Sequence, residues 1–164
     1  MNTTGSGKQA ITPGQLEARV LAAIGQGNIK QAVVTCRQLN KQFPEFASGW
    51  YTASQLAARV GNARGALQAI EQALELEPES PRWQLQKAVC LMRMGDNQSA
   101  RPLLEQLDKL DLDSGFQCAQ LALQLSRLDK HERALHHYQR AIRLEPRLSE
   151  HHYNLATVHR FLGN

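Results

Sequence analysis

Histidine is the residue type in this sequence with the clearest potential for chemistry, and it is distributed unevenly. All six histidines follow residue 130: His131, His136, His137, His151, His152 and His159. Imidazoles on adjacent helices could bind a metal ion, or they could make one end of the protein sensitive to pH near neutrality. The spacing disfavours a metal, because no His-x-x-x-His pair occurs and the adjacent His136 and His137 point about 100° apart on a helix. We therefore expect no metal and no cofactor.

Other reactive residues lack the neighbours that catalysis or phosphate binding requires. The segment Gly5–Lys8 ("GSGK") resembles the end of a phosphate-binding loop, but Asn2 occupies the first glycine position, Gln9 replaces the Ser or Thr, and no strand precedes it. Asp111 and Asp113 fall in a predicted exposed connection between helices. No combination of Ser, His and Asp, or of Cys and His, falls at positions that would converge. We expect no catalytic site in this chain.

The composition narrows the class of protein. The 164 residues carry a net charge of +4, from 19 basic and 15 acidic side chains. Cys36, Cys90 and Cys118 are far apart and form no Cys-x-x-Cys pair, which argues against both disulfides and zinc. No apolar segment approaches the ~20 residues that span a bilayer, and no secretory signal is recognisable. We expect a cytoplasmic protein without membrane contact, and a mild preference for acidic partners.

The elements that must position functional side chains recur at a constant spacing along the sequence. The first set of positions with this spacing is Gly27, Gly61, Gly95, Asp129 and Gly163, and the second is Ala32, Ala66, Ala100 and Ala134. A fixed 34-residue period indicates a stacked repeat protein. After a flexible tail at residues 1–12, the sequence divides into units 13–46, 47–80, 81–114 and 115–148 and a half unit 149–164, without insertion or deletion.

Each unit is predicted to contain two helices joined at the glycine. Asn28, Asn62 and Asp96 are expected to cap the second helices, with Asp129 in this role one place earlier in the fourth unit. First helices are expected to begin after three capping residues: Thr12 (paired with Gln15), Ser80 and Ser114. Pro102 lies inside a second helix, where it is expected to bend the helix or displace its start.

Small residues at fixed positions predict how the two helices of a unit pack. The four alanines of the second set imply close approach of antiparallel backbones, where a larger side chain would clash. The matching positions on the first helices are mostly small: Val20, Ser54, Ala88, Ala122 and Ala156. Larger apolar residues such as Leu56, Ile70 and Leu121 are expected to fill the remaining core.

These positions resemble those of the tetratricopeptide repeat across residues 13–164. The matching residues are Trp50, Ser54, Gly61, Ala66, Ala73 and Pro78, all within a 34-residue helix pair. The resemblance implies an all-α, right-handed α-solenoid of about four and a half helix-turn-helix repeats that works by binding proteins or peptides. Arg19, Gln84 and Lys87 depart from the apolar residues usual at their positions, which affects local packing.

The resemblance also implies a binding groove, because first helices line the concave face of such arrays. The inward positions are Tyr51, Gln55, Arg59, Arg82, Leu85, Val89, Arg93, Phe116, Leu123, Arg127, Tyr153 and Arg160. Stacking would make a ladder of Arg59, Arg93 and Arg127, which occupy the same position in three successive units. A basic and aromatic groove suits an extended peptide with acidic side chains. The alternative is that these arginines only complement the carboxyl ends of their helices.

Two alternative functions follow from other parts of the sequence. The final residues "HYNLATVHRFLGN" resemble the last repeats before the catalytic domain of bacterial tetratricopeptide-sulfotransferase proteins. Asn164 matches Asn28 as the cap of a second helix, so we expect the chain to be the amino-terminal piece of a longer protein. The resemblance implies that this longer protein is a sulfotransferase, in which the piece recruits substrate or dimerises. The apolar stripe at 155–162 predicts end-to-end association.

RNA-binding helical repeats are the second alternative. The apolar Leu85 and Val89 on the inner face disfavour RNA binding.

Overall fold

The computed structural model describes residues 10–147 and 149–163, and within these residues it contains nine helices and no strand. The segment Gly5–Lys8 and the predicted cap Asn164 lie outside the described residues. The helices are α1 (Pro13–Gly25), α2 (Ile29–Gln42), α3 (Ala47–Arg59), α4 (Ala63–Leu76), α5 (Pro81–Arg93), α6 (Asn97–Leu107), α7 (Gly115–Arg127), α8 (His131–Leu144) and α9 (Ser149–Phe161). The all-α prediction is confirmed. No helix of this described chain is both long and apolar enough to cross a bilayer.

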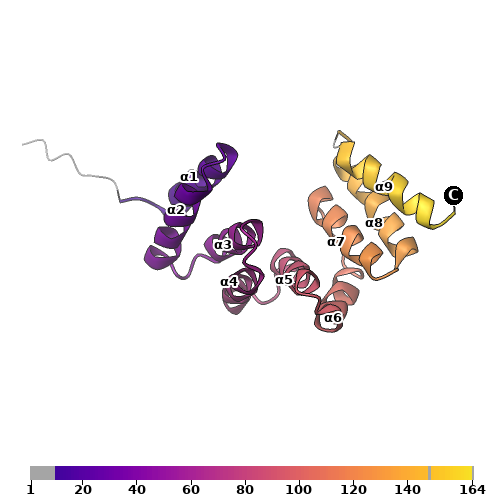
Figure 1. The fold of residues 1–164 in the computed structure, drawn as a ribbon, viewed down its shortest axis with the longest axis horizontal. Helices are drawn as coiled ribbons and strands as arrows, with labels where there is room; N and C mark the ends of the chain where they lie inside the picture. Colours follow the sequence, from indigo (N-terminus) through magenta and orange to yellow (C-terminus); the bar gives the residue numbers. More distant parts are fainter. Residues whose placement is uncertain (1–9, 148, 164) are drawn as a thin grey trace, which may run out of the picture.

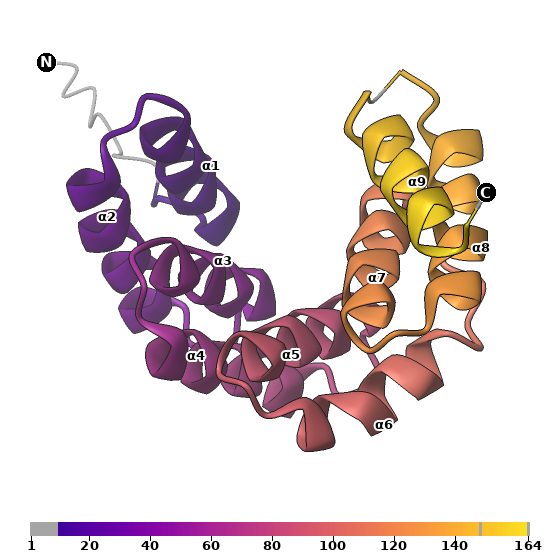
Figure 2. The same ribbon diagram turned by 45° about the vertical axis from the view of Figure 1, so that its right-hand side comes forward.

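The helices form successive hairpins that stack into an arc (Figure 1). In Figure 2, α1, α3, α5 and α7 lie on the inner side of the arc, and α2, α4 and α6 follow its outer side. The helix α9 packs against α8 and also contacts α7. Each hairpin therefore shares its core with the next, as expected for a solenoid, and the first helices form the concave wall.

Short turns with a left-handed residue end the first helices. Gly27, Gly61 and Gly95 have φ of 73°, 81° and 82°, a conformation that glycine adopts without steric cost. The residue that follows each glycine caps the next helix, as predicted: Asn28, Asn62 and Asp96 accept hydrogen bonds from the backbone N–H three residues later. Thr12, Ser80 and Ser114 likewise cap the first helices, as predicted.

The prediction that Asp129 caps α8 is wrong. Asp129 has a φ of 59° and occupies the left-handed position that glycine holds in the earlier turns. Lys130 is the residue at the N-cap, and its side chain makes no capping hydrogen bond. An aspartate tolerates this backbone better than most residues, because its short polar side chain can interact locally.

The close helix contacts within hairpins are as predicted for the first four units. The second-helix alanines that recur with the repeat are all buried, with exposures of 0–1%: Ala32, Ala66, Ala100 and Ala134. Val20, Ser54, Ala88 and Ala122 on the first helices have no exposed surface. Ala156 is exposed instead, so the predicted pattern fails there. The described chain contains no second helix paired with α9, which is anchored through the buried Val158.

Pro102 does not displace the start of α6. That helix begins directly after its Asp96 cap, as α2 and α4 begin after theirs. It ends at Leu107, however, whereas the position equivalent to the last residue of α4 is Leu110. Leu112, which stands where the other units have proline, is buried. The shorter α6 leaves Asp108 at the helix end, where it can turn toward α8.

Candidate functional site

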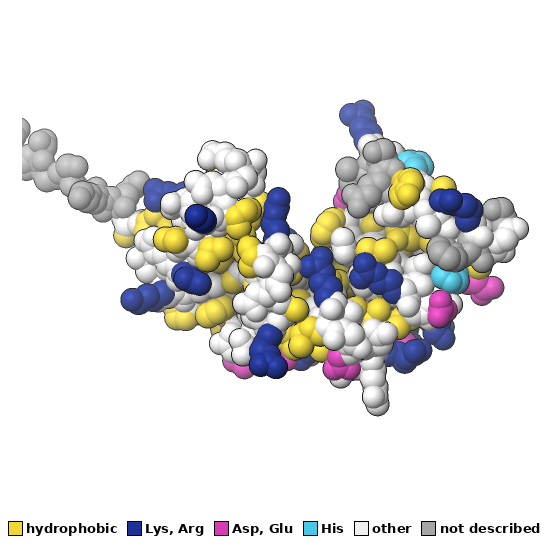
Figure 3. Space-filling model, in the orientation of Figure 1, with side chains coloured by type: hydrophobic (Ala, Val, Ile, Leu, Met, Phe, Trp, Pro, Cys, Tyr) yellow, Lys and Arg dark blue, Asp and Glu magenta, His cyan; other side chains and the backbone are white. Residues whose placement is uncertain are grey.

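The concave wall contains a cavity of about 270 Å³ formed by α3, α5 and α7. Eight residues predicted from the sequence line it: Tyr51, Gln55, Arg59, Arg82, Leu85, Val89, Arg93 and Phe116. Four further residues complete the lining: Ala58, Gln86, Gln117 and Gln120. Figure 3 shows basic and hydrophobic side chains together along the hollow between the two arms of the arc. We call this cavity the inner groove.

The inner groove is positively charged. Arg59, Arg82 and Arg93 line it, and no carboxylate is among its lining residues. No ion pair within the described part of the chain involves any of these three arginines. Four glutamine amides add neutral donors and acceptors. The combination can bind carboxylates through charge-assisted hydrogen bonds and can also pair with a peptide backbone.

An aromatic cluster holds Arg82 in place. Its guanidinium carbon lies 4.4 Å from the centre of the Tyr51 ring and 5.4 Å from the centre of the Trp83 ring. The two rings are themselves 4.7 Å apart. Gln55 Nε2 donates a 2.8 Å hydrogen bond to the Tyr51 hydroxyl, and Trp83 Nε1 donates one of 2.9 Å to Glu77. The floor of the groove is therefore built from side chains that have defined partners.

Four of the predicted groove residues do not line this cavity: Leu123, Arg127, Tyr153 and Arg160. Arg127 donates a 3.3 Å hydrogen bond to Gln124 in its own helix. Leu123 packs against the core, and Tyr153 and Arg160 are exposed on α9. The cavity reaches the last residues of α3 and α5 but only the first turns of α7, so it runs obliquely across the helices. For this reason it includes Arg59 and Arg93 but not Arg127.

The sequence-based set also missed polar residues that line the cavity. Gln86 and Gln120 are one repeat apart, so the period links them as equivalent positions of α5 and α7. That spacing could have indicated that both glutamines lie on the concave face. The period does not show that their amides face the same cavity as the arginines, because this depends on how far one hairpin is rotated relative to the next.

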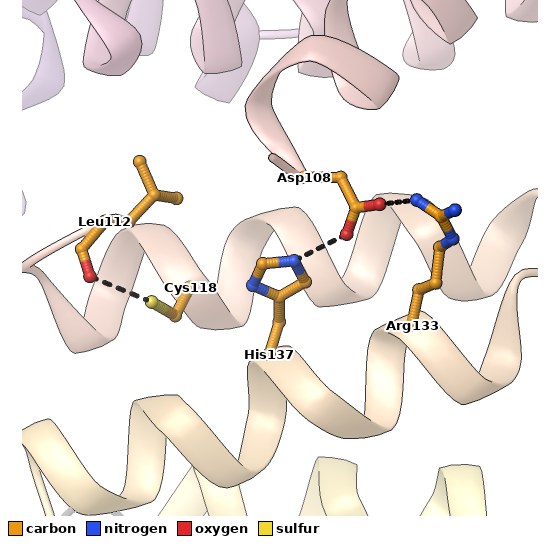
Figure 4. A network of polar contacts seen from close by, with 5 residues as sticks. All are labelled: Asp108, Leu112, Cys118, Arg133 and His137. Carbon is orange, nitrogen blue, oxygen red and sulfur yellow. Dashed lines mark hydrogen bonds and ion pairs between the residues drawn. The ribbon is translucent and has the colours of Figure 1, made fainter. Parts of the chain in front are cut away.

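The histidine-rich end contains a buried polar network (Figure 4). Asp108, at the end of α6, binds Arg133 and His137 of α8, and His137 Nε2 lies 2.8 Å from Asp108 Oδ1. Burial, followed by the charges of His136, Arg140 and Arg133, lowers the pKa of His137 to about 4. A neutral imidazole then donates its Nε2 proton to Asp108. Its buried Nδ1 has no hydrogen-bond partner within the described chain.

The network connects the end of α6 with α8 and does not resemble a metal centre. Arg140 Nε donates a 2.9 Å hydrogen bond to the carbonyl of Leu112, and its guanidinium also pairs with Asp111. Within the residues that the structure describes, no three His, Cys, Asp or Glu side chains are grouped as a metal site requires. The arrangement is suited to holding the segment after the shortened α6 against the next hairpin.

The three cysteines are buried thiols. Cys36, Cys90 and Cys118 are free, and burial raises the pKa of each, to about 11 for Cys36. The thiolate is the reactive form, so none of these side chains is activated as a nucleophile at neutral pH.

Comparison with known proteins identifies the repeat. The family model for the tetratricopeptide repeat matches residues 57–125. A thermophilic tetratricopeptide-repeat protein of Thermus thermophilus is 18% identical, with a TM-score of 0.77 over 90% of this chain and 81% of that one. YrrB, described as having an unusual peptide-binding site, is 15% identical with a TM-score of 0.60, over 92% and 77% of the two chains. In the Cut9–Hcn1 hetero-tetramer of the APC/C, the match is 18% identical with a TM-score of 0.79, over 93% and 30%.

Because these identities are all low, the likenesses show the fold alone. No curated protein matches the chain in sequence.

Proposed function

Because the chain folds as a solenoid of tetratricopeptide repeats, we propose that it is a protein-interaction scaffold whose inner groove binds an extended, acidic segment of a partner protein. The observation that carries this proposal is the composition of the groove. Arg59, Arg82 and Arg93 line one cavity together with four glutamines and no carboxylate. Among the described residues these three guanidinium groups have no ion-pair partner, so they are available to a ligand.

The groove crosses three helices of the concave wall, which favours an extended segment as its ligand. Its volume is about 270 Å³. A cavity of this size accommodates one or two anchoring side chains of a segment that continues along the concave wall. Leu85, Val89 and the half-exposed Phe116 supply an apolar surface beside the arginines. A segment that alternates carboxylates with apolar residues fits this surface.

A labelled peptide of alternating glutamate and proline tests the proposal. Proline keeps such a peptide extended and prevents it from forming a helix. We expect saturable binding by fluorescence anisotropy, which weakens as salt is added. Replacing both Arg59→Ala and Arg93→Ala should lower the affinity by about tenfold or more, because each charge-assisted hydrogen bond contributes about 1.5–3 kcal/mol.

Arg127→Ala is the matched control. Arg127 is the last residue of α7, just as Arg59 and Arg93 are the last residues of α3 and α5, but it does not line the cavity. Its loss should leave the affinity nearly unchanged. Equal losses in the Arg127 and the Arg59/Arg93 variants would refute a specific groove and indicate a general charge effect.

The same titration bears on both alternative functions. Tighter binding of single-stranded RNA than of the acidic peptide, with a steep salt dependence, would favour RNA binding and refute the peptide proposal. If the chain recruits substrate for a larger, sulfotransferase-type enzyme, the inner groove should also bind the acidic peptide. In that case the acidic segment belongs to the protein substrate.

A further inference from the structure

The outer side of the arc contains a second cavity, of about 460 Å³, between α2 and α4. No Cα atom of α2 lies within 8 Å of a Cα atom of α4, and α3 forms the floor between them. The lining residues are Val33, Cys36, Arg37, Asn40, Lys41, Trp50, Ala53, Leu56, Ala57, Val60, Asn62, Gly65 and Ala69. We call this cavity the outer groove. It shares no lining residue with the inner groove.

Small residues keep the outer groove open. Ala53 and Ala57 lie on its floor, and Gly65 and Ala69 lie on the side of α4 that faces α2. Trp50 is half-buried, and its Nε1 donates a 2.7 Å hydrogen bond to the carbonyl of Pro44. The indole is therefore held in one orientation as part of the wall.

The charge of the outer groove has one sign. Arg37 and Lys41 are exposed, one turn apart on α2, and no carboxylate lines the cavity. Val60, another lining residue, exposes 55% of its surface at the end of α3. An apolar floor bordered on one side by cations is complementary to an amphipathic segment with apolar and acidic faces.

The next pair of outer helices shows that these features are particular to the first. The positions equivalent to Arg37 and Lys41 one repeat later are occupied by Glu71 and Glu75, so the charge there is reversed. The position equivalent to Ala53 is Lys87, whose Nζ lies 3.1 Å from Glu71 Oε1. The position equivalent to Ala69 is Leu103. Within one fold, the equivalent surface therefore carries acids, an internal ion pair and larger side chains.

We propose that the outer groove binds an amphipathic helix of a partner protein, with leucine-like side chains over Ala53 and Ala57 and carboxylates beside Arg37 and Lys41. A helix fits because the groove has two helical walls and a helical floor, and an amphipathic helix binds by placing its apolar face in such an apolar groove. This site lies on the opposite side of α3 from the inner groove and does not depend on the function proposed for it. The protein would then hold two partner segments at once.

A designed helical peptide tests this proposal. Its leucines recur at helical spacing on one face and glutamates fill the other positions, and it carries a fluorescent label. We expect saturable binding by anisotropy and a shift of the Trp50 indole N–H resonance in the NMR spectrum. Trp50 and Trp83 are the two tryptophans, so the resonance that remains in Trp83→Phe belongs to Trp50. A peptide with serines in place of the leucines and one with lysines in place of the glutamates should each bind at least about tenfold more weakly.

Two protein variants take their residues from the equivalent positions one repeat later. Arg37→Glu with Lys41→Glu reproduces Glu71 and Glu75, and Ala69→Leu reproduces Leu103 and reduces the cavity. Each should weaken the helical peptide by about tenfold or more. Arg59→Ala with Arg93→Ala should leave its affinity unchanged, since those residues line the inner groove. If Ala69→Leu melts early, the charge-reversed variant still provides the test.

Three results would overturn the proposal. The first is failure of the acidic helical peptide to bind, or equal binding of its serine version. The second is binding that neither outer-groove variant weakens. The third is concentration-dependent self-association of the wild type, abolished by Arg37→Glu with Lys41→Glu while no peptide binds. That last result would make a second copy of the chain the occupant.

Discussion

The guanidinium of Arg82, which begins the inner face of α5, stacks on the Tyr51 ring of α3 with 4.4 Å between its carbon atom and the ring centre. The contact joins two successive hairpins across the floor of the inner groove. Arg82 is exposed, but its position is determined by a buried tyrosine. The same side chain therefore contributes to the packing between hairpins and to the positive charge of the groove.

Removal of this contact should have two separable effects. Arg82→Ala should lower the free energy of unfolding by about 0.5–1 kcal/mol, the range for cation–π contacts at exposed sites. It should also weaken the extended acidic peptide. Arg82→Lys keeps the charge but loses the planar stacking, so it should restore binding more than stability. Urea unfolding and anisotropy measure the two quantities. Arg64→Ala, an exposed change on α4, should alter neither.

Overpacking between paired helices should destabilise the fold. Ala66 is 1% exposed on α4, which packs against α3, so Ala66→Leu should cost roughly 1–3 kcal/mol. Ala69→Leu makes the same change three residues later in the same helix, where the side chain faces the outer groove, and should be nearly neutral. Thermal melting followed by circular dichroism compares them. Equal melting temperatures would contradict the close packing of Ala66 between α4 and α3.

Replacing Gly49 by alanine should destabilise the contact between α3 and α2. A Cβ atom there would lie 2.5 Å from Asn40 Oδ1 and 3.1 Å from Leu39 Cδ2, both side chains of α2. Gly49→Ala should therefore lower the free energy of unfolding by roughly 1–3 kcal/mol. Gly14, in the first turn of α1, has nothing within 4 Å of its Cβ position. Gly14→Ala should stabilise the protein by about 0.4–1 kcal/mol. Destabilisation by both changes would contradict the contact with α2.

The turn between α7 and α8 should be improved by glycine. Asp129 has a φ of 59° where the other turns place glycine, and non-glycine residues pay roughly 1 kcal/mol or more there. Asp129→Gly should therefore raise the melting temperature. The reverse experiment is Gly95→Ala, at the equivalent turn with a φ of 82°, which should lower it. No gain from Asp129→Gly would mean that the aspartate makes a compensating local interaction, such as its approach to His131 at 3.7 Å.

Stability should decrease in mild acid because of His137. Its pKa is about 4 in the folded protein and near 6.5 in the unfolded chain, so the unfolded state binds more protons between these values. The contribution is complete above pH 6.5 and is lost as the pH falls toward 4, amounting to at most about 3 kcal/mol. The groups facing His137 are Asp108 from the end of α6 and His136, Arg133 and Arg140 on α8.

His137→Gln tests this pH dependence. Glutamine can still donate to Asp108 but does not titrate, so unfolding free energies measured from pH 7 to pH 4 should become flatter. An unchanged slope would assign the acid sensitivity to other groups.

Local structure was predictable from the sequence because it depends on neighbouring residues. The caps at Thr12, Asn28 and Ser80 follow from side chains that can reach the backbone three residues later. The error at Asp129 came from giving priority to residue type, since the repeat period already aligned it with the glycines. The outward-facing Ala156 was missed because the same period carried the pattern of complete hairpins into α9.

The sequence by itself determined the helices and, for α1 to α8, the face that each helix buries, because these follow from the constant repeat period and from contacts within one hairpin. Only the tertiary structure decided which of the inward residues share a cavity, since that depends on the rotation between hairpins. It brought Arg59 and Arg93 together but left Arg127 outside, and it separated α2 from α4 to open the outer groove. Such rotations result from the packing of many side chains together, so no single residue or spacing specifies them.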